Sequence, residues 1–103
     1  MIAITPKTPY YAVIFTSIRT DENYGYDKTA DRMESLAKKQ KGFLGVESAR
    51  NKIGITVSYW DSLDSIKAWK SENEHEVAQQ KGKTDWYSAY KVRICRVDRD
   101  YEF

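Results

Sequence analysis

His75 is the only histidine of the chain, and its ordinary pKa suits proton transfer near neutral pH. In a pocket it could act as a base or as a hydrogen-bond donor. A lone histidine can also bridge a helix to a buried backbone carbonyl without taking part in chemistry. The sequence leaves both interpretations open.

Aromatic side chains are the second group that could form a site, because their flat faces can bind a flat ligand and their polar tips can orient it. Trp69 is the first candidate for a stacking wall. Each of these rings could equally belong to a packed core. The other candidates are Trp60, Trp86, Tyr59, Tyr87 and Tyr90.

Arg93 and Arg96 are three residues apart on the last expected strand, so they point to opposite faces of the sheet. An arginine that faced a pocket could stabilise an enolate or peroxide anion. The alternative is a salt bridge across a dimer interface. The sequence does not decide which of the two arginines faces inward.

The chemistry of a transition metal is not expected. Three carboxylates follow one another at alternate positions, but the chain has one histidine and one cysteine to offer beside them. A solvated helix face explains these carboxylates better. They are Glu72, Glu74 and Glu76.

The composition indicates one small globular domain. The chain has 103 residues and a net charge of +2, with basic and acidic residues interspersed. No basic block is long enough to follow a phosphate backbone, so nucleic acid is not an expected partner. We find neither a signal peptide nor an apolar run of membrane-spanning length, and therefore expect a cytoplasmic protein that does not enter a membrane.

Hydrophobic periodicity predicts the elements that must position these residues. Residues 1–9 read as an extended arm because of their two prolines. Ser71 to Asn73 reads as a break between two successive helices. The expected strands are 10–18, 43–51, 53–60 and 90–98, and the expected helices are 26–40, one that begins at Asp61 or Ser62, and one that follows the break.

This order predicts an α+β fold, namely a ferredoxin-like split βαβ domain with an antiparallel sheet, over residues 1–103. Its helices can cover only one face of the sheet, whereas the strands are apolar on both. We therefore expect the other face to meet the same face of a second copy, giving a homodimer.

Residues 59–103 resemble the carboxyl half of the antibiotic-biosynthesis monooxygenase family, which belongs to the dimeric α+β barrel group. The strand that ends at Trp60, the helix that ends at Trp69 and the segment from His75 through Ala78, Gln79 and Gly82 to Trp86 and Tyr87 carry the resemblance, which is close over roughly half of the chain. It implies a homodimer with a pocket between sheet and helices in each subunit. Some members oxidise polycyclic aromatic quinols with oxygen alone, and others bind and degrade haem.

Two positions depart from the haem-degrading branch of that family. The haem-binding histidine of that branch corresponds here to Gln79, and the asparagine that it uses on the first strand is missing. Haem degradation is therefore the third of three functional interpretations.

The resemblance and the residues together predict a monooxygenase without cofactor or metal that acts on a planar aromatic or quinol-type small molecule. His75 would be the base or donor, and Arg93 or Arg96 would stabilise the anion. The alternative is a non-catalytic dimeric barrel that binds a small molecule or serves in a stress response. The expected substrate-binding residues are Trp69, Trp60, Tyr59, Gln79, Trp86 and Tyr87.

Overall fold

The computed structural model describes residues 1–21, 25–80 and 86–103, and within this part it leaves the side chains of residues 75–80 undescribed. The elements follow the predicted order, except that one helix stands where two are expected before the last strand. They are β1 (Tyr10–Arg19), α1 (Tyr26–Lys38), β2 (Phe43–Arg50), β3 (Gly54–Trp60), α2 (Leu63–Gln80) and β4 (Tyr87–Val97).

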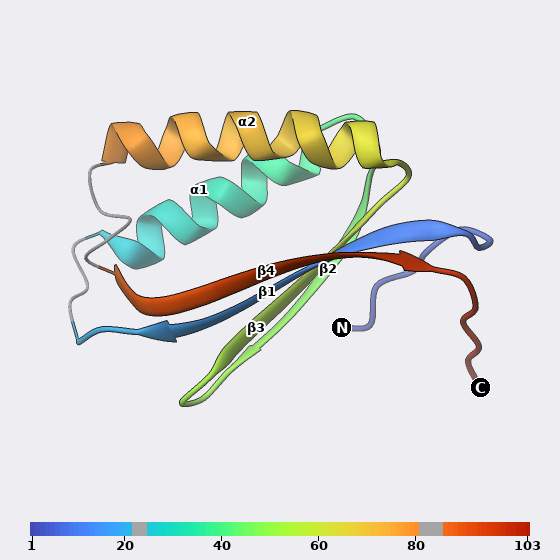
Figure 1. Ribbon diagram of the computed structural model, residues 1–103, viewed down its shortest axis with the longest axis horizontal. Coiled ribbons are helices and arrows are strands. Elements are labelled where there is room, and N and C mark those ends of the chain that lie inside the picture. Colours follow the sequence, from blue (N-terminus) through green and yellow to red (C-terminus); the bar gives the residue numbers. More distant parts are fainter. Residues whose placement is uncertain (22–24, 81–85) are drawn as a thin grey trace.

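The strands form one antiparallel sheet in the order β2-β3-β1-β4. Both β1 and β2 run antiparallel to β3, which lies between them, so α1 connects two parallel strands of a split βαβ unit. Both helices lie on one side of the sheet (Figure 1). The predicted α+β ferredoxin-like fold is thus confirmed.

One prediction about the helices is wrong. The expected break at Ser71 to Asn73 does not occur, because α2 continues through these residues to Gln80. Serine and asparagine favour helix caps, but this preference is worth less than the good helix formers on either side of them. The predicted start is confirmed, since Ser65 N donates to Ser62 Oγ at 3.1 Å in the usual N-cap arrangement.

Two element ends also differ from the prediction. The last strand begins at Tyr87 and not at residue 90, because Tyr87 pairs with Arg19 beyond an irregularity in the ladder. The first helix ends at Lys38, and Gly42 then takes the left-handed conformation expected of it, with φ 86°. Much of the predicted connection after α2, residues 81–85, lies outside the described part.

The helix layer is joined to the sheet by tryptophan packing. Trp60 at the end of β3 is 0% exposed, and its ring stacks on that of Trp69 in α2 with 6.0 Å between centroids. Phe43 of β2 meets the same ring edge-on at 5.5 Å. This contact anchors the first half of α2 over the β2–β3 side of the sheet.

The far face of the sheet, opposite the helices, is crossed at one end by the N-terminal arm. Ala3 N donates to Glu47 Oε2 at 2.9 Å, and Thr5 Oγ1 donates to Tyr10 Oη at 3.0 Å. Tyr10 in turn donates to Asp100 of the C-terminal tail. The arm and the tail leave Ile18 and Ile55 on this face 46% and 45% exposed.

No helix in the described part of the chain is long and apolar enough to cross a membrane.

We expect Trp60→Ala to lower the free energy of unfolding by about 3–5 kcal/mol, because it removes a large ring from a fully buried position. Urea unfolding followed by circular dichroism measures this change. Tyr101→Ala, at an exposed position in the tail, is the control. A loss no larger than that of the control would contradict the anchoring role of Trp60.

The contact between the N-terminal arm and Glu47 predicts that the stability of the fold depends on pH. Hydrogen bonds from Tyr59 Oη and from the backbone of Ala3 hold the pKa of Glu47 below its ordinary value of 4.5. Ionised Glu47 therefore stabilises the fold above pH 4.5, and this contribution is lost as the pH falls through the lowered pKa. The difference in melting temperature between wild type and Glu47→Gln should shrink between about pH 7 and about pH 3. A difference independent of pH would argue against the contact.

Candidate functional site

The helix-facing side of the sheet consists of residues that lie opposite one another across the strands. Antiparallel pairing places them in four rows, because cross-strand partners share a face. In order along the sheet, the rows are Phe43, Trp60, Tyr11 and Arg96; Val46, Ser58, Val13 and Ile94; Ser48, Thr56, Phe15 and Val92; and Arg50, Gly54, Ser17 and Tyr90.

The first row is closed by packing. Trp60 lies between Phe43 and Trp69, and its Nε1 donates to Ser58 Oγ at 2.9 Å. Trp69 itself is only half-buried. Trp69 therefore presents part of its surface outside the core, with the buried Trp60 behind it.

The next rows remain accessible, and we call their residues on β1, β3 and β4 the floor: Val13, Phe15, Ser17, Thr56, Ser58, Tyr90, Val92 and Ile94. The members on β4 are 47–52% exposed, although they share the side of the sheet that the helices cover. On the two central strands, four members of the floor are only half-buried: Val13, Phe15, Thr56 and Ser58. The helices explain this, because α1 packs mainly on β2 and α2 mainly on β3.

The composition of the floor differs from that of an ordinary core. Thr56 places a hydroxyl group on a central strand opposite Phe15, and Ser58 places one opposite Val13. The Ser58 hydroxyl group already serves the packing, because it accepts a hydrogen bond from the buried indole of Trp60, so of these two hydroxyl groups only that of Thr56 goes beyond this need. Flat apolar area with a few polar groups is typical of a small-molecule site.

The far end of the floor is bounded by a cluster of aromatic rings. Phe15 contacts Tyr87 and Tyr90, with centroids 5.4 and 5.5 Å apart. Tyr26 at the start of α1 meets Trp86 and Tyr87 edge-on at 5.7 and 5.8 Å. Such edge-to-face pairs fix ring orientation as well as position.

Tyr87 is a neutral phenol in this cluster. Burial raises its pKa, and its hydrogen bond to Tyr26 Oη, at 3.2 Å, raises the pKa further. The positive charges of Arg50 and Arg19 act in the opposite direction but do not cancel the rise. Tyr87 can thus accept a further hydrogen bond while it donates to Tyr26, whereas it does not supply a base near neutral pH.

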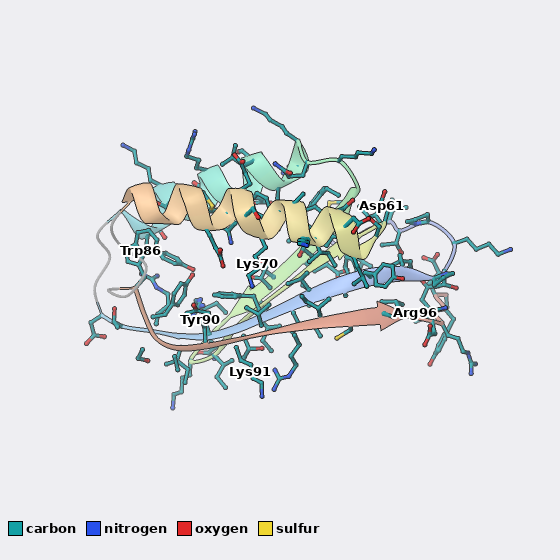
Figure 2. All side chains as sticks on the ribbon, turned by 45° about the horizontal axis from the view of Figure 1, so that its top comes forward. Asp61, Lys70, Trp86, Tyr90, Lys91 and Arg96 are labelled. Carbon is teal, nitrogen blue, oxygen red and sulfur yellow. The ribbon has the colours of Figure 1, made fainter. Side chains whose placement is uncertain are left out.

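Positive charge gathers around the same end. The guanidinium carbon of Arg19 lies 3.5 Å from the centroid of the Tyr26 ring, in cation–π contact. Arg50 extends across β3 to β1, where its Nη2 donates to Ser17 Oγ. Lys70, one turn after the buried Ile66 of α2, extends on the side that faces the sheet (Figure 2). An aromatic molecule with a negative charge suits these surroundings.

The structure places the predicted aromatic residues in two groups. Trp60 and Trp69 lie at the first row, and Trp86 and Tyr87 lie at the far end of the floor. Tyr59 is on the far face, where its Oη donates to Glu47 Oε1 at 2.6 Å. Burial, followed by this hydrogen bond, raises the pKa of Tyr59 to about 12.

The predicted polar residues are dispersed. Arg93 pairs with Ile14 and so belongs to the far face, while Arg96 shares the row of Trp60. The Nε atom of Arg96 lies 2.7 Å from Asp98 Oδ1, at an exposed position near the end of β4 (Figure 2). His75 and Gln79 lie in the second half of α2, and their side chains are outside the described part.

Sequence reasoning missed Arg50, Ser17, Phe15 and Tyr26. Arg50 lies near the end of the expected strand 43–51, and no pattern within that strand marks it as a site residue. Its neighbours come from two other strands, so they become visible only with the register. Glycine at position 54, opposite Arg50, was the one local signal, because it leaves room for a long side chain to cross β3.

In the described part of the chain, no three His, Cys, Asp or Glu side chains are grouped so that they could hold a metal ion. The donors that surround the floor are hydroxyl groups, phenols and guanidinium groups. This set suits a ligand with ring and oxygen atoms.

No protein-family model matches the chain. Among curated proteins, the uncharacterized protein YqjZ of Bacillus subtilis is 54% identical over 101 residues, which cover 96% of this chain and 89% of YqjZ. That identity over almost the whole length shows common family membership.

Solved structures extend the comparison to the fold. SnoaB, a cofactor-independent oxygenase from Streptomyces nogalater, superposes with a TM-score of 0.71 at 8% identity, covering 90% of this chain and 97% of SnoaB. PA3566 from Pseudomonas aeruginosa gives a TM-score of 0.68 at 11% identity, with 91% and 97% covered. A candidate antibiotic biosynthesis monooxygenase from Chloroflexus aurantiacus gives 0.62 at 17% identity, with 91% and 96% covered.

The sequence resemblance is therefore confirmed at the level of fold: the chain belongs to the family of YqjZ and has the fold of the antibiotic biosynthesis monooxygenase-like proteins.

Proposed function

We propose that the protein is a monooxygenase that acts on a planar aromatic or quinol-type small molecule bound on the floor, without a cofactor. The observation that carries this proposal is the half-buried floor itself, where hydroxyl groups and aromatic rings lie on the side of the sheet that should be core. SnoaB, which shares the fold, is a cofactor-independent oxygenase. Because unrelated activities occur on one fold, this likeness adds support only by analogy.

The reaction needs no external reductant. A hydroxyanthracene loses its phenolic proton, and the resulting electron-rich anion gives electrons to oxygen directly. One oxygen atom enters the ring, the ring loses two hydrogens and becomes a quinone, and the second oxygen atom leaves as water. The protein contributes orientation and stabilisation of the anion.

Residues on both layers have roles in this proposal. Trp69 offers its accessible surface as the stacking wall, and Phe15 and Tyr90 offer a second flat surface on the sheet. His75 on α2 is the proposed base or donor. Tyr87, whose hydroxyl hydrogen is donated to Tyr26, can accept a hydrogen bond from a ligand hydroxyl group.

The far face supports a homodimer. Ile18 and Ile55 are nearly half-exposed on it, and the cross-strand pair Ile14 and Val57 lies next to Ile55 on the same face. The helices occupy the other side, so a second copy is the partner that can cover this apolar face by the same surface. The sheets of the two copies would then enclose a common core.

Oxygen uptake tests the reaction. Wild-type protein should consume oxygen with a hydroxyanthracene and not with the methoxy analogue, which has no phenolic proton. We expect His75→Ala to lower kcat by about 10²–10⁴ if it acts as the base, and Trp69→Ala to lower kcat/KM by about tenfold through lost stacking.

Two results would change this interpretation. Equal rates for wild type and His75→Ala would remove His75 from the mechanism. A rise in melting temperature with the hydroxyanthracene, without any product, would favour the non-catalytic binding protein. Haem degradation has its own signature, a Soret band on mixing with haemin.

A charge on the far face tests the homodimer. Ile55→Glu should convert a dimer into a monomer, because the interface would have to bury an unpaired carboxylate. Leu63→Glu on α2 is the matched control, since Leu63 is exposed to a similar degree in the helix layer. Size-exclusion chromatography with light scattering measures the mass, and a monomeric wild type at micromolar concentration would refute the proposal.

A further inference from the structure

Arg50 has an unusual position at the end of β2. Its partner in the ladder is Gly54, and a Cβ at Gly54 would lie 2.1 Å from Arg50 Cζ. The guanidinium group thus lies flat across β3, where only a glycine leaves space for it. It reaches β1 and donates to the hydroxyl oxygen of Ser17, whose side chain is buried.

This position brings a fixed positive charge to the floor. Arg50, Gly54, Ser17 and Tyr90 form a single row across all four strands. The charge of Arg50 also acts on Tyr87, whose pKa it lowers against the effect of burial. The guanidinium group is therefore close to the ring cluster at the far end of the floor.

The hydrogen-bonding capacity of Arg50 is largely unused. A guanidinium group has five N–H donors in a planar fork. Within residues 1–21, 25–74 and 86–103, no carboxylate forms an ion pair with Arg50, and its hydrogen bond is the one to Ser17. Such a fork matches the two oxygens of a carboxylate.

The row is open to a ligand. Arg50 and Tyr90, at the two ends of the row, are both exposed to solvent. Tyr90 is also one of the two rings that contact Phe15 on the floor. A ligand can thus lay a ring against these aromatic residues while an acidic group reaches Arg50.

We propose that Arg50, held by Ser17, binds the carboxylate of a planar aromatic acid whose ring lies on the floor. The proposal rests on the proposed function for the place of the ring, and it adds the substrate class, which is an aromatic carboxylic acid. Arg50 is a binding residue in it and takes no part in proton transfer.

Two naphthalene probes test this assignment without any reaction. 2-Naphthoate and 2-naphthamide have almost the same shape, but only the first carries a negative charge at neutral pH. Isothermal titration calorimetry should show that wild type binds the naphthoate about tenfold more tightly. In Arg50→Gln the two affinities should become equal.

A second variant keeps the positive charge of Arg50 but displaces its guanidinium group. Gly54→Ala places a methyl group where the guanidinium group lies, so Arg50 must leave Ser17. We expect the preference for naphthoate to fall in this variant as well, although every charge remains. Melting curves of both variants verify that the fold is retained.

Lys91→Gln is the matched control for loss of a positive charge. Lys91 follows Tyr90 on β4 and extends to the opposite side of the strand (Figure 2). This variant should keep the full preference for naphthoate.

The results separate this inference from the proposed function. Equal affinities of wild type for the two probes, no binding of naphthoate at millimolar concentration, or an undiminished preference in Arg50→Gln would overturn the carboxylate site, whatever the oxygen uptake. A preference that depends on Arg50, in a protein that consumes no oxygen, would support the site and contradict the oxygenase.

Discussion

The stack of Trp69 on Trp60 is the contact on which the rest of the arrangement depends. Trp60 is the last residue of β3, and Trp69 lies in the first half of α2, which begins at Leu63. The contact therefore fixes one end of the helix layer to the sheet. Beyond that contact the helices pack on β2 and β3 and leave the β4 side less covered. A side of the sheet that would otherwise be core becomes a surface with access for a ligand.

The elements could be predicted because their causes are local. Alternating β-branched and aromatic residues predict β1 and β3, and Ser62 predicts the start of α2. The break expected at Ser71 to Asn73 fails because cap preference is weak beside the cooperative extension of a helix. The early start of β4 at Tyr87 depends on pairing with Arg19, which no pattern within β4 can reveal.

The site was predictable in its aromatic part and not in its charged part. Trp69 is prominent in the sequence because it ends a helical stripe, and its place against Trp60 agrees with that pattern. Arg50 is inconspicuous because it is the last residue of β2 and no pattern within that strand marks it. The pairing register of the strands gives Arg50 its place in the site. It sets Arg50 opposite Gly54 on β3 and brings its side chain to Ser17 on β1, which is distant in sequence and lies beyond β3.

The position of β4 at the edge of the sheet has a consequence for solubility. An edge strand offers unpaired backbone groups to any other strand, and this one also exposes Val92 and Ile94. Lys91 and Arg93 place positive charges on the far face of the same strand, whereas the charge of Arg96 is paired with Asp98. Two such edges repel each other, so the charges act as gatekeepers against strand-to-strand aggregation, and added salt weakens this protection by screening.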